Sequence, residues 1–158
     1  MFRVLIPAAM AALCSAGAFA DPLQECLMES LDKTEAERCI YLHYDTCKAA
    51  SGDDSTAGEV TCLAQEAAVW DGLLNELWPD LRAMAERADA EDTGGGQINA
   101  NALLASQRAW LAYRDAQCAW EYQRYAAGTL RSIIGASCML ETTARRVLEF
   151  RDWLAEGR

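Results

Sequence analysis

Cysteines limit the folds available to this chain more than any other feature. Six of the seven lie between residues 26 and 138, and an even number in an exported protein indicates disulfides. In an antiparallel helical hairpin, bridged residues lie at nearly equal distances from the turn. Pairing the cysteines in chain order puts the midpoints next to Asp32, next to Asp54 and on Gly128, all plausible turns. Six cysteines allow other connectivities, but we predict the pairs Cys26–Cys39, Cys47–Cys62 and Cys118–Cys138.

The first 20 residues predict export. A basic residue is followed by an apolar run over 4–13, and Ala18-Phe19-Ala20 forms an A-x-A cleavage pattern. We expect a signal peptide at 1–20, cleaved after Ala20, and a mature protein that is periplasmic or secreted. Lipid attachment at Cys14 is the disfavoured alternative, because Leu13 stands where such sites need a small residue.

Residues 21–158 predict a single all-α domain. Apolar residues recur at helical spacing, and no stretch shows the alternation of a strand. Thr34 and Thr56 each open a capping box, Asn99 or Asn101 is the expected cap of a later helix, and Pro79 predicts a kink. We expect helices at 22–31, 34–49, 56–90, from 99 or 101 to 127, and 137–155, with a short helical piece at 129–135. The fold class is a compact bundle of four to five helices stapled by about three disulfides, with a cysteine-rich portion at 21–55.

Charge limits the partners. Loss of Arg3 with the signal peptide reduces 14 basic side chains to 13 against 24 acidic ones, a net charge of −11. Nucleic acids and anionic lipid surfaces are therefore poor partners and cationic proteins good ones, although solubility alone also explains such a charge. No stretch after the signal peptide is apolar for long enough to span a membrane.

The residue types needed for catalysis or metal binding are scarce. His43 is the only histidine and no C-x-x-C motif occurs, which argues against a hydrolytic triad and against zinc. Gly94-Gly95-Gly96 lacks the lysine of a phosphate-binding loop. We expect no catalytic residues, no metal and no cofactor.

Two segments form the centre of the predicted bundle: Gln107 to Cys118, and Cys138 to Leu148. On a helical wheel Gln107, Arg114 and Asp115 lie on the side of Cys118, and Arg145 lies on the side of Cys138. A hairpin pinned at the two cysteines places Arg145 near Asp115. We predict a partly buried ionic network that sets the register of the two helices; a charged binding pocket is the alternative.

Tyr113 and Trp120 lie on the opposite side of the same helix among alanines. A helix that is apolar on two sides is either central in a bundle or exposes an adhesive stripe. We expect burial, because the N-terminal hairpins need a surface to pack on. Exposure of Trp120 would favour a partner-binding surface instead.

Three motifs connect these segments to a known family. They are Cys62-x3-Glu66-x3-Trp70-Asp71-x2-Leu74-Asn75-x2-Trp78, Leu104-x2-Gln107-Arg-x-Trp110-x3-Arg114-Asp115-x2-Cys118, and Cys138-x3-Thr142-x2-Arg145-x2-Leu148. The chain resembles the LprI-type lysozyme inhibitor family over about residues 60–150. The resemblance implies a small, exported, helical protein that binds and inhibits lysozyme.

The residues that match the motifs face the hairpin interior, so we expect them to be scaffold. Contacts with a cationic lysozyme are expected in two acidic loops, at Asp53 and Asp54 and at Glu91 and Asp92. The alternative function is an envelope structural or interaction module with an unknown partner. The oligomeric state is left open.

Overall fold

The computed structural model describes residues 22–92 and 94–157, so the predicted signal peptide with its cleavage site, and Cys14, lie outside the described residues. The described residues form helices and no strand, which confirms the all-α prediction. The helices are α1 Pro22–Glu29, α2 Lys33–Glu37, α3 Leu42–Ser51, α4 Thr56–Glu91, α5 Ile98–Arg124 and α6 Leu130–Glu156.

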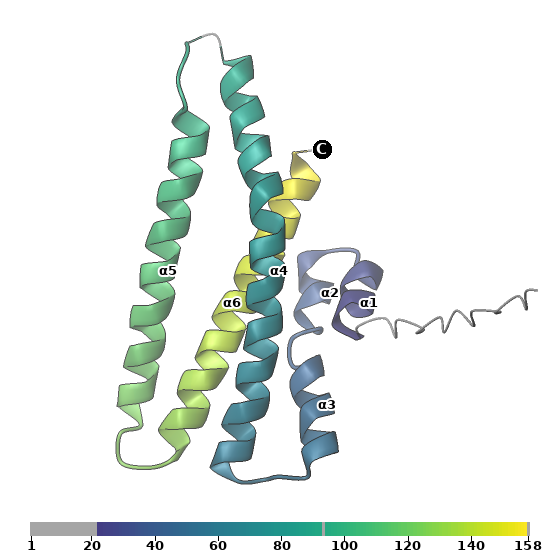
Figure 1. The fold of residues 1–158 in the computed structure, drawn as a ribbon, viewed down its shortest axis with the longest axis vertical. Helices are drawn as coiled ribbons and strands as arrows, with labels where there is room; N and C mark the ends of the chain where they lie inside the picture. Colours follow the sequence, from purple (N-terminus) through teal and green to yellow (C-terminus); the bar gives the residue numbers. More distant parts are fainter. Residues whose placement is uncertain (1–21, 93, 158) are drawn as a thin grey trace, which may run out of the picture.

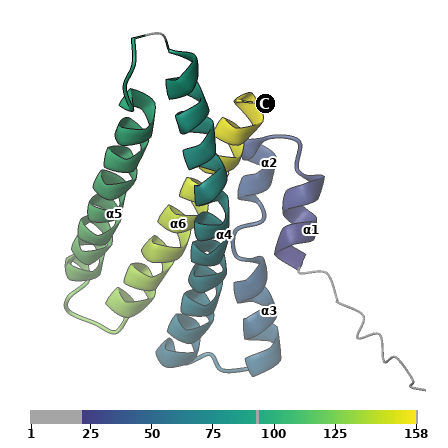
Figure 2. The same ribbon diagram turned by 45° about the horizontal axis from the view of Figure 1, so that its top comes forward.

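The long helix α4 is the centre of the structure (Figure 1). Helix α5 returns antiparallel to α4 on one side, and the three short helices lie on the other side. Helix α6 crosses behind α4 at an angle, and the turned view shows the same arrangement (Figure 2). Helices α4 and α6 pack against each other most extensively, while α5 is covered on one side only.

The core lies between α4 and α6 and is closed by α1 and α2. Trp70 is fully buried, and Trp78 stacks on Phe150 at 6.1 Å between ring centroids. Each fully buried large apolar side chain contributes roughly 1.5–3 kcal/mol. The other large apolar side chains of this core are Leu23, Leu27, Leu63, Leu74, Leu81, Leu140, Val147 and Leu148.

All three predicted disulfides are present: Cys26–Cys39, Cys47–Cys62 and Cys118–Cys138. They tie α1 to the segment after α2, α3 to α4, and α5 to α6. Loops of this length give a stabilisation of about 2–4 kcal/mol per bridge. The bundle is therefore stapled along its short helices and at one end of the α5–α6 pair.

The predicted helix at 34–49 is two helices, because the backbone of Tyr41 enters the left-handed region at φ 82°. The predicted caps at Thr34 and Thr56 are wrong by one or two residues. The carboxylate of Asp32 accepts from Glu35 N, and the hydroxyl of Ser55 accepts from Gly58 N. In both places an acceptor just upstream satisfies the free N–H group of the first turn.

The last two predicted helical pieces are one continuous helix, α6. A Cβ at Gly135 would lie 3.2 Å from Cδ2 of Tyr122, so glycine allows α5 and α6 to approach closely there. Pro79 does not end α4, which runs through it as one helix. None of the described helices combines the length and apolar character needed to span a bilayer.

Candidate functional site

The predicted ionic network does not join α5 to α6: Arg114 pairs with a neighbour on its own helix and with a residue of α4. Arg114 lies 3.1 Å from an oxygen of Asp115 and 3.7 Å from one of Asp71, and its guanidinium lies 5.2 Å from the centre of the Trp110 ring. The predicted contact of Arg145 with Asp115 is wrong. Arg145 is half exposed and pairs with Glu141 on its own helix at 3.0 Å.

The buried cation is Arg146, which is 6% exposed. Its Nε donates to Oε1 of Gln107 at 3.1 Å and its Nη1 donates to Glu149 at 2.9 Å. The guanidinium also lies between 4.9 and 5.5 Å from the rings of Trp110, Phe150 and Trp153. The prediction paired residues at equal distances from the Cys118–Cys138 bridge, as in an ideal hairpin of parallel axes. Packed helices cross at an angle, and the crossing of α5 and α6 turns position 146 toward α5.

The remaining motif residues divide between the core and the surface, so the expectation that all of them face the hairpin interior is wrong. Trp70, Leu74 and Leu148 are buried in the core. Asp71 and Asn75 lie on the exposed side of α4, where Asn75 Nδ2 donates to Asp71 Oδ2 at 3.1 Å. Thr142 Oγ1 lies 3.9 Å from the sulfur of Cys138 and 4.0 Å from that of Cys118. None of these contacts forms an open site.

Glu66 is a motif residue for which the sequence analysis predicted no specific contact. It is fully buried, and its carboxylate accepts from Tyr41 N at 2.6 Å, Tyr44 N at 2.7 Å and Trp70 Nε1 at 2.9 Å. These bonds hold the left-handed turn between α2 and α3 against α4. The sequence contained a signal for this role: Glu66 lies four residues before Trp70, so the two share the apolar face of the predicted helix.

The tip of the α4–α5 hairpin carries one of the two predicted contact sites, Glu91 and Asp92. Asp89 closes the tip: Oδ1 accepts from Asn99 N at 2.7 Å, and Oδ2 accepts from Ala100 N at 2.9 Å. These bonds lower the pKa of the Asp89 carboxyl below its ordinary value, and the bond from Ala100 N has the largest effect. The predicted caps Asn99 and Asn101 are therefore wrong, because a carboxylate from α4 caps α5.

Glu91 and Asp92 are exposed at this tip, which reaches beyond the ends of the other helices (Figure 1). Asp92 Oδ1 accepts from Gly94 N at 3.0 Å, and Gly95 takes a positive φ of 66°. In residues 22–92 and 94–157, no lysine or arginine forms an ion pair with Glu91 or Asp92. The tip thus presents two exposed carboxylates that form no ion pair among the described residues.

The second predicted acidic loop lies at the opposite end of α4, a helix of 36 residues. At 1.5 Å per residue the two loops are about 50 Å apart, so they do not form one site. Asp54 pairs with Lys48 at 3.1 Å, and the carbonyl oxygen of Asp53 accepts from the same ammonium group. Lys48 also pairs with Glu59 at 2.8 Å, so it partly neutralises this end.

The predicted burial of Tyr113 and Trp120 is wrong. Their exposed fractions are 59% and 60%, because α5 packs against its neighbours through one face only. The outer face of α5 is therefore open to a partner.

Charge is divided between the two halves of the described chain. Residues 22–92, which form α1 to α4, contain 17 acidic and 5 basic side chains, a net charge of −12. Residues 94–157, which form α5 and α6, contain 6 acidic and 7 basic side chains, a net charge of +1. A cationic partner is attracted to the α1–α4 side. The described residues contain no group of three or more His, Cys, Asp or Glu side chains arranged to hold a metal ion.

The chain is similar to two uncharacterized bacterial proteins. The chain is 29% identical over 97 residues to an uncharacterized protein of Rhizobium meliloti, covering 58% of this chain and 68% of the relative. It is 23% identical over 138 residues to an uncharacterized 17.7 kDa protein in the puhA 5′ region of Rhodobacter capsulatus, covering 85% of each chain. No solved structure matches.

The family model described as "Lysozyme inhibitor LprI" matches residues 47–150. The match begins earlier than the predicted boundary near residue 60, so it includes Cys47 and the acidic loop before α4. It also includes the tip of the α4–α5 hairpin and both cysteines of the α5–α6 bridge. The chain belongs to the LprI lysozyme inhibitor family.

Proposed function

We propose that this protein binds a lysozyme and inhibits it by stoichiometric contact, without chemistry of its own. The observation that carries the proposal is the LprI family match over residues 47–150. The charge of the chain is compatible with a cationic partner, because opposite net charges accelerate association at low ionic strength.

The tip of the α4–α5 hairpin is the proposed point of contact. Glu91 and Asp92 form no ion pair among the described residues, and the Asp89 bonds tie the start of α5 to the end of α4 on either side of the loop. A loop tied at both ends loses less conformational freedom on binding than a free one. Asp53 and Asp54 are the weaker candidates, because Asp54 already pairs with Lys48 and the Asp53 carboxylate accepts from Ser55 N at 2.9 Å.

Clearing of bacterial cell-wall suspensions tests the function. Purified protein is titrated into lysozymes of several types, and the initial rate of loss of turbidity is recorded. The proposal expects at least one lysozyme to lose activity as the molar ratio approaches one to one. No loss at micromolar excess over every lysozyme would reject it, and clearing by the protein alone would indicate an enzyme.

A matched pair of double variants tests the contact. E91Q/D92N removes two charges at the tip and retains an oxygen acceptor at position 92, whereas D53N/D54N removes two charges at the opposite end of α4. We expect the first variant to weaken inhibition about tenfold or more and the second to change it less than threefold, the range of a rim charge pair. Equal losses would mean that net charge, rather than the tip, controls binding.

We also propose that the protein acts in the periplasm or outside the cell after cleavage behind Ala20. Three disulfides support this, because such bridges persist in oxidising compartments. N-terminal sequencing of the protein recovered from the periplasm or medium tests it. A chain that begins at Asp21 is expected, and retention of the complete chain in the cytoplasm would contradict it.

The second candidate function is an envelope interaction module without lysozyme inhibition. The exposed Tyr113 and Trp120 on α5 favour it, since exposed aromatic side chains are typical of interface anchors. A Y113S/W120S variant tests whether the outer face of α5 contributes to lysozyme inhibition. Full lysozyme inhibition by this variant would show that α5 is not the inhibitory surface.

A further inference from the structure

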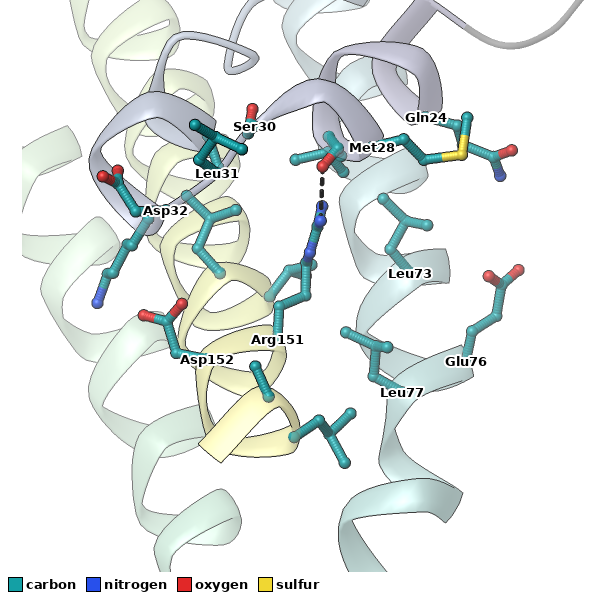
Figure 3. A pocket seen from close by; sticks show the side chains of 17 residues that line it. Gln24, Met28, Ser30, Leu31, Asp32, Leu73, Glu76, Leu77, Arg151 and Asp152 are labelled. Atoms are coloured by element: carbon teal, nitrogen blue, oxygen red, sulfur yellow. Dashed lines mark hydrogen bonds between the residues drawn. The ribbon is translucent and has the colours of Figure 1, made fainter. Parts of the chain in front are cut away.

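A groove of about 460 Å³ lies between the short helices α1 and α2 and the long helices α4 and α6 (Figure 3). Met28 and Leu31 flank it with exposed fractions of 75% and 90%, which is unusual for large apolar side chains. Its volume is in the range of sites for small molecules. Its apolar lining includes Leu27, Leu73, Leu77, Val147, Leu148 and Leu154.

The charged residues of the lining are the cations Lys33 and Arg151 and the carboxylates Asp32, Glu76 and Asp152. Arg151 extends from α6 on the side that faces Leu73 and Leu77 of α4, whereas Asp152 points to the other side of α6 (Figure 3). Nη2 of Arg151 donates to the carbonyl oxygen of Leu27 at 2.6 Å. Among the residues that the structure describes, no carboxylate forms an ion pair with Arg151.

The guanidinium therefore has donors to spare. Arginine carries five N–H donors, and the contact with Leu27 uses one of them. Burial lowers the pKa of Arg151 and the nearby Asp152 carboxylate raises it, but a guanidinium remains charged at neutral pH. A carboxylate head group is the natural partner, because it can accept two parallel N–H bonds from the planar fork.

We propose that the groove binds a single-chain amphipathic carboxylate, with its head group on Arg151 and its hydrocarbon chain along the leucines of α4 and α6. A neutral apolar ligand would leave the free donors of Arg151 unpaired in an apolar setting. A cationic group would have to pair with the lining carboxylates Asp32, Glu76 or Asp152, and it would bring a like charge to the guanidinium of Arg151. The acidic surface of α1–α4 disfavours an anionic membrane but not a monomeric ligand, whose single charge contacts Arg151 directly.

This inference is independent of lysozyme inhibition, since the groove residues differ from those proposed at the hairpin tip. Figure 1 shows α1 and α2 beside the middle of α4, away from the tip. Occupancy of the groove therefore does not require release of a lysozyme.

Calorimetric titration with octanoate, decanoate and dodecanoate below their micelle concentrations tests the proposal on the full mature chain. Saturable one-to-one binding is expected, tightening by up to about fourfold for each added methylene that is buried. Decanol tests the head group, and vesicles of phosphatidylcholine and phosphatidylglycerol test a lipid surface. Binding to vesicles without binding to monomeric carboxylates would overturn the proposal, and so would equal affinity for decanol and decanoate.

Two arginines on α6 provide a matched pair of variants. Arg151→Gln should weaken decanoate binding tenfold or more, whereas Arg145→Gln, outside the groove lining, should leave it within twofold. Arg151→Lys keeps the charge without the fork, so it should bind decanoate more tightly than Arg151→Gln. Circular dichroism confirms that each variant is folded. Unchanged affinity in folded Arg151→Gln would contradict the assignment, as would an absence of decanoate binding to the unmodified protein.

Discussion

Glu66 provides the sharpest test of how the N-terminal helices are held. The carboxylate is fully buried and accepts three hydrogen bonds, two from the backbone on either side of the left-handed turn and one from the indole of Trp70. Glu66→Ala leaves three donors without an acceptor, each at a cost of about 1–3 kcal/mol when buried. Taking the lower part of that range, because Tyr41 and Tyr44 are only partly buried, we expect a loss of about 4 kcal/mol.

Glu66→Gln is the subtler change. One oxygen remains to accept from Tyr41 and Trp70, but an amide NH2 now faces the N–H group of Tyr44. One lost bond and one donor–donor contact correspond to about 2 kcal/mol. In urea unfolding this lowers the midpoint by about 1 M for an m value of about 2 kcal/mol/M.

The exposed neighbour Gln65→Ala serves as the control and should change stability by less than about 0.5 kcal/mol. Circular dichroism at 222 nm follows the helices, and Trp fluorescence follows the core around Trp70. A Glu66→Gln variant with the same urea midpoint as the unmodified protein would refute the proposed role of the carboxylate.

Three further predictions concern stability. The pKa of Asp89 is lower in the folded than in the unfolded protein. The Asp89 carboxylate therefore stabilises the fold above its unfolded pKa of about 3.9, and this stabilisation is lost as the pH falls through the folded pKa. When the thermal midpoint is measured against pH, Asp89→Asn should show a smaller drop below pH ~4 than the unmodified protein. Gly58→Ala places a Cβ 2.5 Å from the carbonyl oxygen of Asp53, so a loss of about 1–3 kcal/mol is expected in urea unfolding, and an unchanged midpoint would show that the loop yields freely. Replacement of Cys118 and Cys138 together by serine should cost about 2–5 kcal/mol, and an unaltered thermal midpoint would show that this bridge does not stabilise the fold.

Helix type and disulfide pairing were predictable because they depend on short-range information. The apolar residues of α4 and α6 recur at helical spacing, which predicts helices without knowledge of the tertiary structure. The midpoints of the cysteine pairs fall on residues that favour turns. The break at Tyr41 was not predictable in the same way. It depends on Glu66, which is 25 residues away in the chain and supplies its hydrogen bonds only after α4 has packed.

The arrangement of α5 depends on tertiary packing to an even greater degree. Arg145 and Arg146 differ by one position, and only the crossing of α5 and α6 decides which of them meets Gln107. Tyr113 and Trp120 were expected inside because their helix is apolar on two sides. The short helices pack on α4 and α6 instead, which leaves that face of α5 uncovered.

The sequence predicted an acidic loop at the hairpin tip but not the hydrogen bonds that join α4 to α5 there. Glu91 and Asp92 are visible in the sequence, whereas the bonds from Asp89 to Asn99 and Ala100 appear only when α4 and α5 lie side by side. These bonds distinguish the tip from the loop at Asp53 and Asp54, where Lys48 is the organising residue.

Titration of lysozyme-driven cell-wall clearing with the unmodified protein and the E91Q/D92N variant tests the central claim most directly. The account predicts that the unmodified protein abolishes clearing near one equivalent and that added salt weakens this inhibition. The E91Q/D92N variant should require at least about tenfold more protein for the same inhibition. Undiminished clearing at a large excess of the unmodified protein, under low salt and with every lysozyme tested, would contradict it.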